Sequence, residues 1–416
     1  MSTFKHARAQ CLKALDIIDS TQLSIFLQRE LPSRDELLTQ IDGLESLPLD
    51  KAITAMQSLL NEVLSVYNDP FANYINPKQH KAYTQRRKGG FVGVGLKYRA
   101  IDDEYPLLIG PLLGGPLEHQ NLMPGDKIIS ANNIDLKSKS SREVAGYLKG
   151  EPNSSVTLRF ERNGKQHDIE AQRQAVQLHY ARSEMLKSNI GYLKVSRFGG
   201  KTHLSFKSLL EDLLKRNTHA ILLDLRDNPG GSTKAARTMM SLFDDAPWVF
   251  CEQYKNGTVK QLPRAGKRIT ELPMVILVNE YSMSSSEILA GALQDYKRAK
   301  LVGAPTYGKG LIQRVFPLAE PIGGAIRTTI AMYGTPNHKL LHGRGLVPDI
   351  YVPTPPERLY RETGSINISH EARVFRRNLQ IELLKDQYPA DVLKVYANYP
   401  DAQLDVALTT LKDQLG

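Results

Sequence analysis

Two residues with clear chemical potential, a serine and a lysine, each follow a short apolar run in the second half of the chain. Ser284 comes after the run 274–278, and Lys309 comes after the run 300–303. If these runs are parallel neighbours joined by a helix near 285–296, the crossover brings their carboxyl ends to the same edge of a sheet. Reacting groups favour that edge in open α/β sheets. The spacing therefore predicts that Ser284 and Lys309 meet there.

Lys309 is the candidate base for Ser284. A serine hydroxyl is a poor nucleophile until a base takes its proton, and no histidine lies near Ser284 in the sequence. A lysine can act as that base when burial and nearby positive charge favour its neutral amine. Gly308 and Gly310 flank Lys309 and allow a tight turn of the backbone. Gln313 is placed to orient the lysine through a hydrogen bond.

Two glycines follow a third apolar run. The run 220–225 leads through an Arg-Asp-Asn-Pro segment into Gly230 and Gly231, and then into an expected helix. Glycines at the carboxyl end of a strand leave backbone N–H groups open to a tetrahedral oxyanion. An ordinary strand-to-helix turn explains the same residues, so the oxyanion role rests on its agreement with Ser284 and Lys309.

Both reactive residues also fit other patterns. Ser284 stands three residues before Glu287, which is the spacing of a helix capping box. The segment 303–309 has the spacing of a phosphate-binding loop, but Gly310 occupies the place of its final Ser or Thr. The residues that follow indicate a strand, whereas such a loop leads into a helix. Helix capping therefore stays open as an alternative, and phosphate binding is disfavoured.

The apolar patterns indicate an α+β multidomain chain in four parts. Residues 1–88 show helical spacing, and residues 89–174 show short β-like runs between turns. Residues 175–353 have buried runs separated by helical stretches, which is typical of an α/β core with crossover βαβ units. Residues 354–416 are expected to be helical. Their helices are expected near 370–387 and 401–414.

The composition is that of a folded, water-soluble chain. The 416 residues are 41% hydrophobic and 24% charged, no apolar stretch reaches the ~20 residues of a membrane span, and the N-terminus lacks the apolar core of a signal peptide. The net charge of +10 is spread along the chain, which favours a basic solvated surface over nucleic-acid binding. Cys11 and Cys251 are too few for a disulfide framework or a zinc site, so we expect two buried thiols.

Residues 69–352 resemble the carboxyl-terminal-processing peptidases, also called tail-specific proteases. That family carries a PDZ module in front of a serine/lysine protease core. The order and spacing of the motifs make the resemblance specific. The motifs are Asp69-Pro70-Phe71, 90–95 (GFVGVG), 123–128 (MPGDKI), 225–231 (LRDNPGG), the windows around Ser284 and Lys309, and 345–349 (GLVPD).

The resemblance implies a role for each matching position. The nucleophile falls on Ser284, the general base on Lys309 and the lysine-orienting residue on Gln313. The oxyanion turn falls on Gly230 and Gly231, with the amide of Ser285 as a second donor. Positions that support the site in the family fall on Glu287, Asp295 and Thr306.

Residues 89–174 resemble a PDZ domain, in which loop amides hold a peptide's C-terminal carboxylate and an open strand edge pairs with the peptide. The loop residues in this chain are Phe91, Val92, Gly93, Val94 and Gly95. A PDZ-like fold that only supports the protease domain is the alternative. The chain departs from the family pattern at Lys149, where an arginine is common, and before the nucleophile at Glu280, Tyr281 and Met283.

Residues and resemblance together predict a serine endopeptidase that recognises C-terminal tails and uses no cofactor, metal or nucleotide. The expected partners are proteins or peptides with exposed C-termini, a second copy bound through the terminal helices, and an adaptor or regulator protein. The resemblance implies the bacterial periplasm or cell envelope, whereas the lack of a visible signal peptide leaves the cytoplasm open. The alternative function is a non-catalytic PDZ adaptor in which Ser284 caps a helix and Lys309 stays charged.

Overall fold

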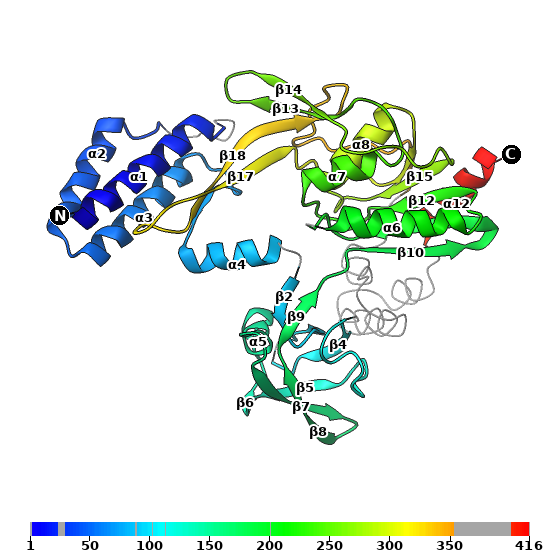
Figure 1. The fold of residues 1–416 in the computed structure, drawn as a ribbon, viewed down its shortest axis with the longest axis horizontal. Helices are drawn as coiled ribbons and strands as arrows, with labels where there is room; N and C mark the ends of the chain where they lie inside the picture. The colour runs from blue at the N-terminus through cyan, green and yellow to red at the C-terminus, as the bar shows by residue number, and fades with distance from the viewer. Residues whose placement is uncertain are drawn as a thin grey trace. The chain divides into compact units, whose positions relative to one another are not determined.

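The computed structural model describes residues 2–23, 30–87, 90–101, 103–112, 114–199, 201–352 and 401–415. Internal contacts separate two compact units, whose elements are labelled in Figure 1. The first unit combines residues 1–85, 247–263 and 308–345, and the second combines residues 86–246, 264–307 and 346–416. The segment expected as one protease core, 175–353, therefore contributes to both units.

A six-stranded sheet forms the centre of the second unit. In their order of pairing, its strands are β10 (Ala181–Leu186), β11 (Ile190–Val195), β12 (Ala220–Asp224), β15 (Met274–Val278), β16 (Lys300–Gly303) and β19 (Ile350–Tyr351). The pairings from β11 to β19 are parallel, and β10 runs antiparallel to β11. Val275 pairs with Lys300 and Val278 with Gly303. This register confirms that the runs 274–278 and 300–303 are parallel neighbours.

Helices cover both faces of this sheet. On one face, α12 (Ala402–Leu415) packs Ala407 and Leu411 into a cluster with Tyr192 and other strand residues. On the other face lies α6 (Thr202–Lys215), because a Cβ on Gly191, the neighbour of Tyr192, would meet Leu213 at 3.1 Å. α7 (Thr233–Met240) packs against α8 (Ser285–Asp295). Burial on both faces explains why the central strands β12 and β15 are largely apolar runs.

The helical predictions for the C-terminal part have different outcomes. α12 confirms the helix expected near 401–414. The helix expected near 370–387 lies outside the described residues. Across the part of the chain that the structure describes, no helix is both long and apolar enough to cross a bilayer.

The second unit also contains the β-rich module expected after residue 88. Its main sheet runs in the order β3 (Leu96–Arg99), β4 (Leu107–Pro111), β5 (Lys127–Ala131), β7 (Ser155–Arg162) and β8 (Lys165–Gln172), with β6 (Ile134–Asp135) beside β5. β2 (Gly90–Gly93) pairs with β9 (Gln174–Gln177). The helix α5 (Ser141–Leu148) packs Val144 and Leu148 on the module's core.

The first unit joins helices from the N-terminus to an antiparallel sheet from later in the chain. Its helices are α1 (Ser2–Thr21), α2 (Arg34–Gly43), α3 (Leu49–Val66) and α4 (Pro77–Arg87), with a short 3-10 turn at Leu44–Ser46. The strand order is β1 (Asn73–Ile75), β18 (Ala325–Gly334), β13 (Trp248–Tyr254) and β14 (Val259–Pro263), with β17 (Leu311–Pro317) also on β18.

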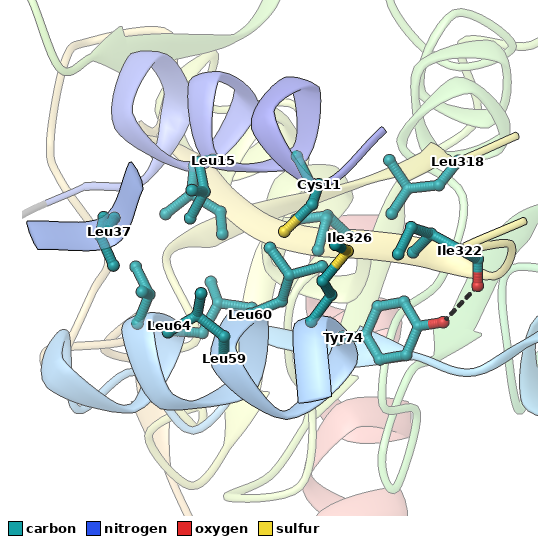
Figure 2. Packing of buried hydrophobic residues seen from close by; sticks show 14 of the residues in the cluster. Cys11, Leu15, Leu37, Leu59, Leu60, Leu64, Tyr74, Leu318, Ile322 and Ile326 are labelled. Carbon is teal, nitrogen blue, oxygen red and sulfur yellow. Dashed lines mark hydrogen bonds between the residues drawn. The ribbon is translucent and has the colours of Figure 1, made fainter. Parts of the chain in front are cut away.

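A separate hydrophobic core holds α1, α2 and α3 on the sheet, as Figure 2 shows. Cys11 of α1 and Leu60 of α3 pack with Ile322, which lies in the turn between β17 and β18. The Tyr74 hydroxyl donates a hydrogen bond to the Ile322 carbonyl at 3.1 Å. Cys11 and Cys251 are both buried and free, as predicted, and burial raises the pKa of the Cys11 thiol to about 12.

Candidate active site

Two strand-to-loop exits in the second unit have the same spacing. Ser284 follows the end of β15 by six residues, and Gly230 follows the end of β12 by six residues. β12 and β15 are adjacent and parallel, so their carboxyl ends lie at one edge of the sheet. A Cβ placed on Gly230 would lie 2.6 Å from the Ser284 Cβ and 2.8 Å from the Ser285 nitrogen. The glycine turn is therefore packed directly against the serine.

The backbone of Ser284 has an unusual conformation. Its φ is 59° and its ψ is −119°, at the residue that immediately precedes α8. Ser33 and Ser140 precede their helices in capping boxes of the same kind, with φ of −63° and −59° and extended ψ. A positive φ costs a serine on the order of 1–3 kcal/mol. Helix capping alone does not explain this conformation, because the two capping serines do without it.

Glu287 holds the turn around Ser284 from a fully buried position. One carboxylate oxygen accepts the Ser284 N–H at 2.8 Å, and the other accepts the Thr306 hydroxyl at 2.6 Å. The Thr306 oxygen in turn accepts the Leu346 N–H at 2.7 Å. The part of the capping box in which Glu287 binds the backbone of Ser284 is therefore present, and it ties the serine to the loop after β16.

The three serines around Ser284 fasten its loop to the glycine turn. The hydroxyls of Ser282, Ser285 and Ser286 donate to the carbonyls of Leu225, Gly231 and Asn228 at 2.8–3.1 Å. These three serines are fully buried, whereas Ser284 is partly exposed. Of the serine cluster 282–286, Ser284 is thus the member that solvent or a substrate can reach.

The glycine turn has one amide already in use. The Gly230 N–H donates to the Asn228 side chain at 2.9 Å. Gly231 has φ of 144°, and a Cβ there would lie 2.2 Å from the Phe198 carbonyl oxygen, so this position needs glycine. In this conformation the Gly230 N–H is therefore not available to an oxyanion, and the residue contributes only its lack of a side chain. The backbone N–H groups of Gly231 and Ser285 are the candidate donors to the oxyanion.

Lys309 belongs to the first unit and stands just before β17. The Tyr333 hydroxyl donates to its carbonyl, and the Tyr333 N–H donates to the Gly310 carbonyl at 2.9 Å. The Lys309 Nζ lies 4.5 Å from the centroid of the Phe71 ring. Gln313 donates through Nε2 to the Thr329 hydroxyl at 3.2 Å.

The glycines beside Lys309 fit tightly against the loop 341–345. Gly308 has φ of 80°, and a Cβ there would lie 2.8 Å from the Gly345 nitrogen. A Cβ on Gly310 would lie 2.2 Å from the His342 nitrogen. Both positions therefore need glycine, which agrees with the tight turn expected around Lys309. Ser284 and Lys309 fall in different units, so their pairing stays a prediction.

Comparison with known proteins decides the family. The family model "Peptidase family S41" matches residues 189–352, and the model "PDZ domain" matches residues 107–172. A carboxyl-terminal-processing protease of Synechocystis sp. is 30% identical over 354 residues, which cover 83% of this chain and 78% of the relative. The chain belongs to the carboxyl-terminal-processing proteases of peptidase family S41.

Other relatives agree with this assignment. A carboxyl-terminal-processing protease of Picosynechococcus sp. is 30% identical over 338 residues, 80% of this chain and 76% of the relative. The solved structure titled photosystem II D1 C-terminal processing protease has a TM-score of 0.55 and 25% identity, and the match covers 88% of this chain and 98% of that one. The protein is accordingly a serine-type peptidase with a PDZ domain.

The PDZ loop of this S41 peptidase is partly engaged within its own domain. The Val94 N–H donates to the Leu148 carbonyl at 3.2 Å, and Gly93 forms an isolated bridge with Lys149. The Lys149 amine lies 5.1 Å from the centroid of the Phe91 ring. The end of α5 thus occupies one of the amides that we expected to bind a carboxylate.

Two further site predictions have different outcomes. Thr306 and Glu287 lie together with Ser284, as described above. Asp295 is the last residue of α8, at the opposite end from Ser284. A helix of this length separates its ends by about 15 Å. The structure therefore does not bring Asp295 to the serine, and its supporting role stays a prediction.

Sequence reasoning missed a buried ionic cluster beneath the glycine turn of the peptidase. Arg226 donates to Asp224 at 2.7 Å, Lys194 donates to Asp224 at 3.0 Å, and the three side chains are at most 5% exposed. Arg226 also binds Asp401, just before α12, at 2.7 Å. Burial acts to raise the pKa of the Asp224 carboxyl, but the charges and hydrogen bonds of Arg226 and Lys194 outweigh it and hold that pKa well below its usual range.

The sequence does contain a signal for this cluster. Asp224 interrupts an apolar strand and is followed closely by Arg226, and a charged pair in a buried run is rarely left unpaired. Asp227, next in the chain, has its pKa raised mainly by burial, and its Oδ1 accepts a hydrogen bond from Asn279 at 3.0 Å. Charged residues therefore hold the backbone that leads into the glycine turn.

Proposed function

We propose that this chain is an endopeptidase that cleaves proteins with exposed C-terminal tails by acylation of Ser284, with Lys309 as the base. One observation carries the proposal: Ser284 stands at the start of α8 with a positive φ, partly exposed, and packed against Gly230. A strand-turn-helix junction of this kind presents a hydroxyl at the edge of a sheet. The first amides of α8 also provide positive potential there.

The proposed reaction has two balanced halves. The Ser284 hydroxyl attacks the carbonyl carbon of the scissile bond while its proton passes to the neutral Lys309 amine. The amides of Gly231 and Ser285 stabilise the oxyanion, and the lysine returns the proton to the leaving amine. Water, losing a proton to the same lysine, then attacks the acyl-serine; the lysine passes that proton to the departing Ser284 oxygen, which releases the new C-terminus and restores the free serine and the neutral amine.

The chain itself limits how far Lys309 can lie from the serine loop. The Tyr307 N–H donates to the Ser282 carbonyl at 3.1 Å. Lys309 follows Tyr307 by two residues, and two residues span at most about 7 Å. This short tether supports the pairing of Lys309 with Ser284.

The PDZ domain supports recognition of tails. β3 stands at the end of the strand order of its sheet, so it offers backbone groups to an added strand. Across from it lies α5, because the Tyr98 hydroxyl donates to the Ser141 carbonyl at 2.9 Å. We propose that a C-terminal tail adds to β3 beside α5. A second copy, an adaptor protein and an envelope location are implied by the resemblance alone.

The proposal is tested by degradation of β-casein, a largely unfolded substrate. The wild-type chain and Ser208→Ala, a change on the exposed face of α6, are expected to degrade it at similar rates. Ser284→Ala is expected to be at least about 10³-fold slower, because the nucleophile is lost. Equal rates in all three proteins would remove Ser284 from the mechanism and leave the adaptor function as the better account.

A further inference from the structure

The amine of Lys309 has an aromatic neighbour. Its Nζ lies 4.5 Å from the centroid of the Phe71 ring, within the range in which the face of a ring attracts a cation. Both residues belong to the first unit, and Phe71 is partly buried. Because the attraction applies only to the protonated amine, the ring acts on the protonation state of the proposed base.

Phe71 is held in place by buried polar groups. The Asp69 carboxylate accepts the Phe71 N–H at 2.8 Å through one oxygen and the Gln22 side-chain amide at 2.8 Å through the other. The side-chain oxygen of Gln22, Oε1, accepts the Thr329 N–H of β18 at 3.0 Å. Gln22 is fully buried and Asp69 is 6% exposed. These bonds form a relay from Phe71 through Asp69 and Gln22 to Thr329. Burying such polar groups is costly unless they are hydrogen-bonded, so the relay needs all of its bonds.

The relay returns to the residue expected to orient the lysine. Thr329, which binds Gln22 through its N–H, accepts a hydrogen bond at its hydroxyl from Gln313 at 3.2 Å. Gln313 is four residues after Lys309 and lies on β17, which pairs with β18. The ring under the amine and the strand that follows the lysine are therefore fixed to one another through Asp69, Gln22 and Thr329.

We propose that Phe71 is a positioning residue for Lys309, and that Asp69 and Gln22 hold its ring beneath the amine so that the resting enzyme keeps the ammonium form. The inference rests on the proposed function of Lys309 as the base. The ring favours the protonated amine, and a change in pH or the binding of substrate must outweigh it before the lysine can accept a proton.

Asp69, Tyr333 and His342 are titratable residues next to the two partners of this contact. The Asp69 carboxylate is engaged by Phe71 and Gln22, and the Tyr333 hydroxyl donates to the Lys309 carbonyl. Burial lowers the pKa of His342, and the charge of Asp69 opposes that shift. A change at Phe71 is therefore read most directly on the Lys309 signal itself.

The test measures the titration of Lys309 by NMR in protein labelled with ¹³C-lysine. The signal that is missing from Lys309→Ala identifies the residue. Phe71→Leu removes the aromatic face and keeps an apolar side chain, so the titration midpoint is expected to fall by about one pH unit. Phe71→Tyr keeps the aromatic face and is expected to leave the midpoint unchanged. Gln22→Met, which breaks the relay, is expected to move it in the same direction as Phe71→Leu.

The pH dependence of kcat/KM for β-casein gives a second readout. The acid limb is expected to shift to lower pH in Phe71→Leu by the same amount as the NMR midpoint. An unchanged midpoint in Phe71→Leu, with a thermal midpoint equal to that of the wild type, would overturn the role of Phe71. A shifted midpoint with unaltered hydrolysis by Lys309→Ala would instead overturn Lys309 as the base, so the two proposals fail separately.

Discussion

Lys309→Arg is expected to lower kcat/KM for β-casein by at least about 10³-fold at every pH from 6 to 9. The guanidinium stays protonated throughout this range, so it cannot accept the serine proton. A positioned general base contributes about 10²–10⁴-fold. The fold is expected to survive, because the structure holds this position through backbone groups: Tyr333 binds the Lys309 carbonyl and the Gly310 carbonyl.

A matched control comes from the same unit. Lys260 lies exposed on β14, and Lys260→Arg makes the same chemical change away from the proposed site. Its kcat/KM and thermal midpoint are expected to equal those of the wild type. If Lys309→Arg kept more than a tenth of the wild-type activity, another residue would have to serve as the base.

Arg226→Met is expected to destabilise the second unit by about 3 kcal/mol. The change leaves Asp224 buried with only Lys194 as its cationic partner, and it removes the bond to Asp401 before α12. Breaking a buried ion pair by removal of one partner typically costs about 3–5 kcal/mol. The remaining lysine places the expectation at the lower end. The midpoint of urea unfolding, followed by a probe in this unit, measures the loss.

The control for this change is an exposed ion pair on the same unit. Asp212 lies on α6 and Arg216 directly follows the helix, and both side chains are more than half exposed. Arg216→Met is expected to cost less than about 1 kcal/mol, because such pairs are screened by water. Arg226→Met is also expected to speed amide hydrogen exchange in α12, which Arg216→Met leaves unchanged. Equal effects of the two variants would contradict a stabilising role for the buried cluster.

The core of the second unit was predictable because its strands are buried on both faces. Largely apolar runs at 220–225, 274–278 and 300–303 became β12, β15 and β16, and their parallel order follows from the helical stretches between them. The antiparallel sheet of the first unit was not predicted. β13 and β18 pair residues about 80 positions apart, and no local pattern reports such a pairing.

The site shows a similar division. The spacing of Ser284 and Glu287 predicted a capping box, the family resemblance placed Thr306 in support of the serine, and the structure brings these three residues together. The backbone angles of Ser284 could not be predicted from the sequence. Ser284 has the same spacing to its glutamate as the capping serines Ser33 and Ser140, but its φ has the opposite sign. The sequence also could not show that the Asn228 side chain accepts the Gly230 N–H, which we had expected to bind the oxyanion.

The most direct test of the central claim is to locate a covalent adduct of the nucleophile on the protein. The chain is treated with a fluorophosphonate, which modifies activated serines, and its modified peptide is sequenced by mass spectrometry. We predict one adduct, on Ser284, and none in Lys309→Ala under the same conditions. An adduct on Ser282, Ser285 or Ser286, or equal labelling of Ser284 without Lys309, would contradict the account.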